Sequence, residues 1–271
     1  MQAAVETAAG KLWSPLAGRP LVQLQGVTKR YANGTIAVTG VDLTLRDGEF
    51  VSLLGPSGCG KTTVLRMIAG LGEVSAGSVE WPTSKHDWRG RPVRDLGFVF
   101  QEATLMPWAT ALQNVLLPLK LKYRPPREAT QQAEEALASV GLAAFKNAYP
   151  RELSGGMKMR VSIARALVTE PRILLMDEPF AALDEITRHK LNDDLLALWN
   201  AKRFTVAFVT HSVFESVYLS QRIVVMAARP GRVIADIATG TSYPRDEGFR
   251  TSPEYAEACR VVSAKLQEAI G

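Results

Sequence analysis

Gly55-Pro-Ser-Gly-Cys-Gly-Lys61-Thr62 is the stretch that decides the fold of this chain. It fits the pattern G-x-x-x-x-G-K-[ST], in which glycines let successive backbone N–H groups turn toward an anion. The short apolar run Glu49–Leu54 precedes the stretch, and a helical pattern over Lys61–Leu71 follows it. Strand, glycine loop and helix in this order favour a phosphate-binding loop over a chance glycine-rich turn.

Every position of this phosphate loop is a candidate contact for the phosphates of a nucleotide. The candidates are Gly55, Pro56, Ser57, Gly58, Cys59, Gly60, Lys61, Thr62 and Thr63. Lys61 is expected to reach the β- and γ-phosphates, and the Thr62 hydroxyl to ligate Mg²⁺. A low pKa is expected for the Cys59 thiol, because Lys61 and a helix N-terminus lie close to it in sequence.

A second motif, Arg172-Ile-Leu-Leu-Met-Asp177-Glu178, places two carboxylates after a buried strand. Ligands of open α/β sheets bind at the carboxyl ends of the strands. Asp177 is therefore a candidate magnesium ligand, and Glu178 is a candidate base that polarises the attacking water. By itself the motif is equally compatible with a structural role, but its occurrence beside a phosphate loop favours the catalytic one.

From the helix just before the second motif onward, helical and strand patterns alternate along the sequence. This alternation favours a mainly parallel sheet covered by helices. The segments expected are helix Gly156–Thr169, strand Ile173–Met176, helix Glu185–Ala201, strand Thr205–Thr210, helix Val213–Ser220 and strand Arg222–Ala227. Near the N-terminus, alternating runs at Leu21–Leu24 and Val41–Leu45 are separated by turn dipeptides, which predicts antiparallel strands. Glu102–Arg151 is expected to be helical, and a last helix is expected at about Pro253–Ile270.

Bulk composition limits the class of protein. Hydrophobic residues make up 46% of the chain and the net charge is +5, which fits a globular domain with an ordinary solvated surface or a modest anion-binding patch. Two distant cysteines indicate a reducing compartment. No signal peptide and no apolar run of the roughly 18 residues that span a bilayer is visible, so membrane work would need another chain.

Six motifs in order give the chain its resemblance to a family. They are Tyr31, Gly55–Thr62, Gln101, Leu153-Ser-Gly-Gly156, Asp177-Glu178 with Leu183-Asp184, and His211. Together they resemble the nucleotide-binding subunit of ATP-binding-cassette (ABC) transporters, over roughly Leu21–Arg232. The resemblance implies a P-loop α/β cassette with a mainly parallel core sheet, an antiparallel β subdomain and a helical subdomain at about 102–151. The expected domains are a leader at 1–20, the ATP-binding domain at 21–240 and a helical tail at 241–271.

The resemblance also implies roles for single residues. Tyr31 would stack on adenine, although it could instead be a core tyrosine. Gln101 would contact magnesium and the attacking water, although it could be a plain surface residue. Ser154, Gly155 and Gly156 would contact the γ-phosphate held by a second copy, although Ser154 could simply cap a helix.

Two further residues complete the implied catalytic set. Asp184 would signal across the dimer, and His211 would touch the γ-phosphate. Glu178, His211, Lys61 and Gln101 are thus the candidate catalytic residues. Thr62, Gln101 and Asp177 are the candidate magnesium ligands, with ATP and Mg²⁺ as the bound species.

A narrower resemblance concerns the transported solute. Leu153-Ser-Gly-Gly-Met157, Met106-Pro-Trp108 and Ala228-Arg-Pro-Gly231 are similar to the nitrate/sulfonate/taurine import branch, some relatives of which import pyrimidine precursors. Met157 replaces the glutamine that commonly ends the signature, and activity is expected to survive because the phosphate contacts come from the serine and glycines.

The resemblance implies partners as well. A head-to-tail dimer would dock to an integral membrane permease at the cytoplasmic face of the inner membrane. A periplasmic or lipid-anchored solute-binding protein would act indirectly. The segment after Gln101, with Leu105, Met106 and Trp108, would line the docking groove, although these apolar residues could equally be core.

Two rival functions are disfavoured. An ABC ATPase acting on nucleic acid or ribosomes usually has two cassettes or a long heptad insertion, and this chain has neither, so no nucleic-acid partner is expected. A regulatory module that binds ATP without hydrolysing it would not need Glu178 and His211, and both are present.

Overall fold

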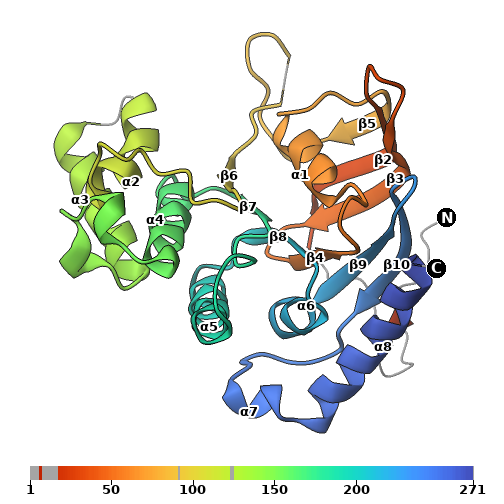
Figure 1. Cartoon of the computed structure of the whole chain (residues 1–271). Coiled ribbons are helices and arrows are strands. Elements are labelled where there is room, and N and C mark those ends of the chain that lie inside the picture. The colour runs from red at the N-terminus through yellow and green to blue at the C-terminus, as the bar shows by residue number, and fades with distance from the viewer. Residues whose placement is uncertain (1–5, 8–17, 91, 123–124, 271) are drawn as a thin grey trace. The chain divides into compact units, whose positions relative to one another are not determined.

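Two compact units make up the chain, and the computed structural model describes all of it except residues 1–5, 8–17, 91, 123–124 and 271. The first unit comprises Met1–Arg94 and Thr205–Gly271, and the second comprises Asp95–Phe204. The first unit therefore joins the two ends of the sequence, whereas the second is one continuous segment inserted between them (Figure 1).

Parallel strands at the centre of the first unit carry the phosphate loop. β4 (Phe50–Leu54) lies between β8 (Thr205–Thr210) and β9 (Arg222–Ala227) and runs parallel to both. Every residue of these three strands is buried. Continuous apolar runs are typical of parallel strands that are covered on both faces. The prediction of a mainly parallel core is confirmed here, and the bounds of β8 and β9 are those expected.

The rest of the first unit extends and covers this sheet. β10 (Arg232–Ala238) pairs antiparallel with β9, and β1 (Glu6–Thr7) pairs in parallel with β10. The helices of the unit are α1 (Lys61–Ala69), α6 (Val213–Leu219), α7 (Glu247–Arg250) and α8 (Pro253–Ile270). α8 contacts α6, β9 and β10 (Figure 1). The predicted tail thus packs on the sheet that carries the phosphate loop. Most of the predicted leader lies outside the described residues, and the boundaries at 20 and 240 stay predictions.

A separate antiparallel sheet completes the first unit, as expected. Its strands, in spatial order, are β3 (Ile36–Arg46), β2 (Pro20–Arg30) and β5 (Ala76–Glu80). In the central strand, Leu24 pairs with Leu43 on one side and with Val79 on the other. Alternate positions along β3 are buried, so one face of this sheet packs inward while the other meets solvent.

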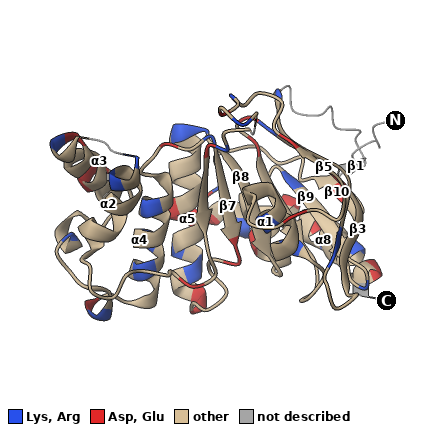
Figure 2. Ribbon diagram, turned by 90° about the horizontal axis from the view of Figure 1, so that it is seen from above, with Lys and Arg blue, Asp and Glu red and all other residues tan. Residues whose placement is uncertain are grey.

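The second unit combines two parallel strands with helices. β6 (Leu96–Val99) pairs with β7 (Ile173–Asp177). The helical elements are α2 (Ala111–Leu121), α3 (Pro126–Ser139), the 3₁₀ turns η1 (Ala143–Phe145) and η2 (Pro150–Glu152), α4 (Gly155–Leu167) and α5 (Glu185–Lys202). α2, α3 and α4 contact one another. Figure 2 shows basic and acidic residues interspersed along α3 and α5, as on an ordinary solvated surface.

A buried ion-pair network joins three strands of the first unit. The guanidinium of Arg222, which is 6% exposed, donates to both carboxylate oxygens of the fully buried Glu49, at 2.6 and 3.0 Å. It also donates to Asp236 Oδ2 at 2.8 Å and to the Thr44 carbonyl at 2.6 Å. Burying charges costs free energy, but removing one partner costs more, because it leaves the other charge buried and uncompensated.

Replacing Arg222 should therefore destabilise the protein strongly. We expect Arg222→Met to lower the free energy of unfolding by roughly 3–5 kcal/mol, measured by urea denaturation. Arg260→Met is the matched control, because it removes the same charge from an exposed pair with Glu257 and should leave the midpoint unchanged. Equal midpoints for the two variants would contradict a structural role for the network.

Candidate functional site

The phosphate loop is closed on itself by its own lysine. β4 ends at Leu54, and α1 begins at Lys61. The Lys61 ammonium donates to the carbonyl oxygens of Gly55 and Pro56, at 2.7 and 3.0 Å, and the residue is only 4% exposed. The lysine therefore holds the loop in a curled conformation, the shape in which a phosphate loop can turn N–H groups toward an anion.

Close packing explains the first glycine of the loop. A Cβ atom at Gly55 would lie 2.4 Å from the carbonyl oxygen of Met226 and 2.8 Å from Cys59 Sγ. Contacts this short do not occur for real side chains, so any larger residue would displace the loop from β9. Glycine at this position is therefore required by the packing of backbone on backbone.

The low pKa that the sequence predicts for the Cys59 thiol is not found in the structure. Its side chain is fully buried, and burial raises the pKa of Cys59 although the Lys61 ammonium, 3.9 Å from the sulfur, acts in the opposite direction. The expected low pKa is therefore wrong, because desolvation of a thiolate here outweighs the nearby positive charge. Cys59 fills space beneath the loop and exposes no sulfur to solvent.

His211 lies at the same sheet edge as the phosphate loop. β4 and β8 are parallel neighbours, with Leu54 paired to Thr210, so the residues that follow each strand leave the sheet together. His211 is exposed, and the next residue, Ser212, caps α6 by accepting a hydrogen bond from the Glu215 N–H at 3.3 Å. The Thr210 hydroxyl contacts the Glu215 carboxylate at 2.5 Å and accepts from the Ser212 N–H, which fixes the backbone on both sides of His211.

Tyr31 is a surface residue, so the alternative of a core tyrosine is wrong. It follows β2, is 44% exposed and enters the turn in which its N–H donates to the Thr35 carbonyl. Lys29 Nζ lies 5.4 Å from the ring centroid. An exposed aromatic ring of this kind can stack on a base.

In the second unit, Gln101, Asp177 and Glu178 lie at the same end of the paired strands β6 and β7. Val99 of β6 pairs with Met176 of β7, so Gln101 and Asp177 leave neighbouring parallel strands at the same end. Asp177 is 8% exposed, and Gln101 is exposed. Glu178 has a backbone φ of 45°, in the left-handed region that residues other than glycine rarely adopt. Strain of this kind is typical of residues held in a required direction at a functional site.

The glycine-rich signature and Asp184 meet at one residue of α5. Ser154 caps α4 by accepting from the Met157 N–H at 3.2 Å, and its contact with a phosphate held by a second copy stays a prediction. Asp184 caps α5 by accepting from the Thr187 N–H at 2.9 Å, and this bond lowers the pKa of Asp184. A Cβ at Gly156 would lie 2.7 Å from Thr187 Cγ2. The starts of the two helices are therefore packed together through Thr187.

The segment after Gln101 presents an apolar side chain to solvent. Trp108 is 76% exposed, which rules out the alternative that it belongs to the core. Buried Asn114, which sequence reasoning missed, accepts from the Met106 N–H at 2.8 Å and donates to the carbonyls of Ala109 and Thr110. Asn114 thereby holds the loop that carries Trp108. The only sequence signal nearby is the capping box between Thr110 and Gln113.

Oxygen atoms dominate the candidate metal ligands. Within the described part of the chain, no group of three His, Cys, Asp or Glu residues could hold a metal ion. The predicted ligands are instead the Thr62 hydroxyl, the Gln101 amide and the Asp177 carboxylate. This donor set fits Mg²⁺, which is commonly bound through one or two carboxylates together with the phosphates of its substrate.

The sequence of this chain is similar to those of one known protein family. Residues 38–181 match the family model described as "ABC transporter". An uncharacterised ABC transporter ATP-binding protein of Methanocaldococcus jannaschii is 46% identical over 239 residues, covering 87% of each chain. An aliphatic sulfonates import ATP-binding protein of Bacillus subtilis is 44% identical, covering 79% of this chain and 81% of the relative.

A solved structure agrees with these relatives. A dimeric ATP-binding cassette bound to ADP and phosphate superposes with a TM-score of 0.70 at 37% identity, covering 80% of this chain and 98% of the other. Among the described residues, no helix combines the length and the apolar composition needed to cross a bilayer.

Burial of Cys59 should make it a slow nucleophile. A raised pKa leaves less thiolate at pH 8 than a free thiol has, and the buried sulfur is also inaccessible. We expect iodoacetamide to modify Cys59 much more slowly in the native protein than in concentrated urea, as followed by mass spectrometry of the peptide. Equal rates under the two conditions would show that the loop opens readily.

Proposed function

This chain belongs to the family of ABC transporter ATP-binding proteins, and from this premise we propose that it powers the import of a small sulfonate-type solute. Its activity is ATP hydrolysis coupled to transport. The observation that carries the solute class is the similarity to two aliphatic sulfonates import ATP-binding proteins, of Bacillus subtilis and Bacillus cereus, at 44% and 40% identity. Nitrate, taurine and pyrimidine precursors are the related alternatives.

The roles that we propose for the phosphate loop and His211 follow from their position at the same end of two neighbouring parallel strands, β4 and β8. The N–H groups of the phosphate loop and the Lys61 ammonium bind the β- and γ-phosphates. His211, which leaves the neighbouring parallel strand, contacts the γ-phosphate. Tyr31 stacks on the adenine ring, for which its exposed face is available.

The second unit supplies the chemistry of hydrolysis in this proposal. Glu178 orients and polarises the attacking water, and its strained left-handed backbone, a feature typical of functional sites, supports this role. Gln101 contacts the same water. Asp177, Gln101 and Thr62 would hold Mg²⁺, which supplies charge neutralisation for the leaving phosphate when it is bound.

Assembly is the remaining part of the proposal. We infer that two copies pair head to tail, with Ser154, Gly155 and Gly156 of one copy contacting the γ-phosphate in the other. Two solved structures of one related cassette, in one of which it is bound to ADP and phosphate, are described as dimeric, and this supports the pairing. The dimer docks to a permease at the cytoplasmic face of the membrane, and Trp108 is the anchor because it is a large apolar side chain exposed on a held loop.

Glu178→Gln tests the catalytic assignment. The amide keeps the shape of the side chain and cannot accept a proton, so turnover should fall by roughly 10²-fold or more while ATP binding remains. Gel filtration with MgATP should then show an ATP-bound dimer. Glu254→Gln, an exposed position on α8, is the matched control and should keep full turnover. Near-normal turnover of the Glu178 variant would remove this residue from the catalytic role.

Growth on a defined sulfur source tests the solute and the docking residue together. A strain that lacks this chain should fail to grow on an aliphatic sulfonate as sole sulfur source and should grow normally on sulfate. The wild-type chain and Trp88→Ala should restore growth, because Trp88 is exposed but lies outside the proposed docking segment. Trp108→Ala should not restore growth, although the isolated variant should keep its ATPase activity.

Other outcomes of this experiment separate the two parts of the proposal. Normal growth of the deletion strain on sulfonate, with a defect on nitrate, would overturn the solute class alone. Loss of ATPase activity in folded Trp108→Ala would place this residue in the catalytic machinery and not in a docking surface.

A further inference from the structure

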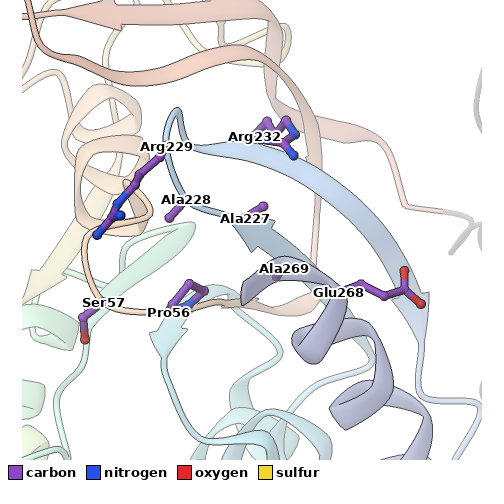
Figure 3. Close-up of a pocket in the computed structure, with 8 residues that line it drawn as sticks. All are labelled: Pro56, Ser57, Ala227, Ala228, Arg229, Arg232, Glu268 and Ala269. Atoms are coloured by element: carbon purple, nitrogen blue, oxygen red, sulfur yellow. The ribbon is translucent and has the colours of Figure 1, made fainter. Parts of the chain in front are cut away.

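A pocket of the first unit lies beside the phosphate loop. Its volume is about 510 Å³, and it shares only Pro56 and Ser57 with the residues assigned to nucleotide binding. The end of β9, the turn that follows it and the last turns of α8 form its other walls (Figure 3). Ala227 and Ala228 have short side chains, so they leave the space between Arg229 and Arg232 open.

Positive charge in this pocket is not balanced by the protein. Arg229 and Arg232 both line the pocket and are exposed, and within the described residues neither side chain has an ion pair or a hydrogen bond. Glu268 is the one carboxylate among the lining residues, and it is already paired with Lys265 at 3.0 Å. In Figure 3, Arg229 extends toward the side where Ser57 lies, and Glu268 lies on the opposite side.

The turn that carries Arg229 is held in place by its backbone. Gly231 donates to the Ala37 carbonyl at 3.0 Å, and its own carbonyl accepts from the Thr39 N–H at 2.8 Å. A Cβ at Gly231 would lie 2.2 Å from the carbonyl oxygen of Cys59, so the turn rests directly on the phosphate loop. The backbone from which Arg229 extends is therefore fixed, so only side-chain freedom is lost when the arginines bind a ligand.

We propose that this pocket is a binding site for a small oxyanion, held by Arg229 and Arg232. A guanidinium is planar and offers paired N–H donors that match the oxygens of phosphate, sulfate or sulfonate groups. Pocket volume, two cations without protein partners and a fixed turn all favour such a ligand. The site is distinct from the curled N–H groups of the phosphate loop, because Arg229 lies in the β9–β10 turn and Arg232 is the first residue of β10.

The test must first occupy the phosphate loop, which can itself bind anions. Protein saturated with a non-hydrolysable MgATP analogue, which also fills the γ-phosphate position, is titrated calorimetrically with sodium sulfate, sodium phosphate or sodium methanesulfonate, against sodium chloride at matched ionic strength. We expect saturable binding of one oxyanion per chain. The ranking of the three salts distinguishes an inorganic ligand from an organic sulfonate.

Substitutions then locate the site. Arg229→Asn with Arg232→Gln should weaken the binding by about tenfold or more, since hydrogen bonds to charged groups are lost. Asparagine is chosen because Arg229 has φ 61°, a conformation that asparagine tolerates. Arg127→Gln with Arg260→Gln removes the same charge elsewhere on exposed helices and should leave the affinity unchanged. Glu268→Gln should strengthen binding, because it removes the only lining carboxylate.

Three results would overturn the proposal. They are no saturable binding to the analogue-loaded protein, an affinity that the Arg229 and Arg232 substitutions leave unchanged, and an equal loss in the Arg127 and Arg260 control. The last result would show that only the overall charge attracts the anion. Failure of the protein to bind the analogue would count against the proposed ATPase site and not against this pocket, since in nucleotide-free protein the Arg229 and Arg232 substitutions still separate anion binding in the pocket from anion binding at the phosphate loop.

Discussion

Contact of backbone on backbone around the phosphate loop is the constraint on which the rest of the first unit depends. Gly55 packs against the Met226 carbonyl of β9, and Gly231 packs against the Cys59 carbonyl of the loop. No side chain fits between these segments, so the loop takes its curled shape from β9 and the turn after it. Lys61 then closes the curl from within through the Gly55 and Pro56 carbonyls. The anion site is thus shaped by the fold before any ligand arrives, and little ordering cost remains for binding.

Two buried arginines keep the surrounding elements fixed by different means. Arg222 is neutralised by Glu49 and Asp236. Arg245 is only 5% exposed and donates to the carbonyls of Val217, Tyr218 and Ser220, at the end of α6. Burial lowers the pKa of Arg245, and the partial negative charge at a helix C-terminus stabilises its cation in place of a carboxylate. The segment before α8 is thereby attached to the helix that follows His211.

Local patterns predicted the strands and helices well, and long-range pairing escaped them. β8, β9 and α8 lie where the sequence placed them, because continuous apolar runs and helical spacing are properties of neighbouring residues. β10 was missed, because most of its residues are half-exposed and carry no clean alternation. The motifs predicted the candidate site residues, whose roles stay predictions, whereas the burial of Cys59 and the left-handed backbone of Glu178 depend on packing. Arg222 and Glu49 are 173 positions apart, so no local pattern could pair them.

The division of the first unit between the two ends of the sequence has a consequence for biosynthesis. β4 leaves the ribosome without either of its neighbours, because β8 and β9 are encoded after the whole second unit. Gly48 and its partner Thr205 are separated by 157 positions, which at roughly 5–20 residues per second means a delay of about ten seconds or more. During this interval the second unit can fold as a continuous segment. The nascent phosphate loop, by contrast, lacks Met226 and Gly231 and cannot acquire its shape until these residues have been synthesised.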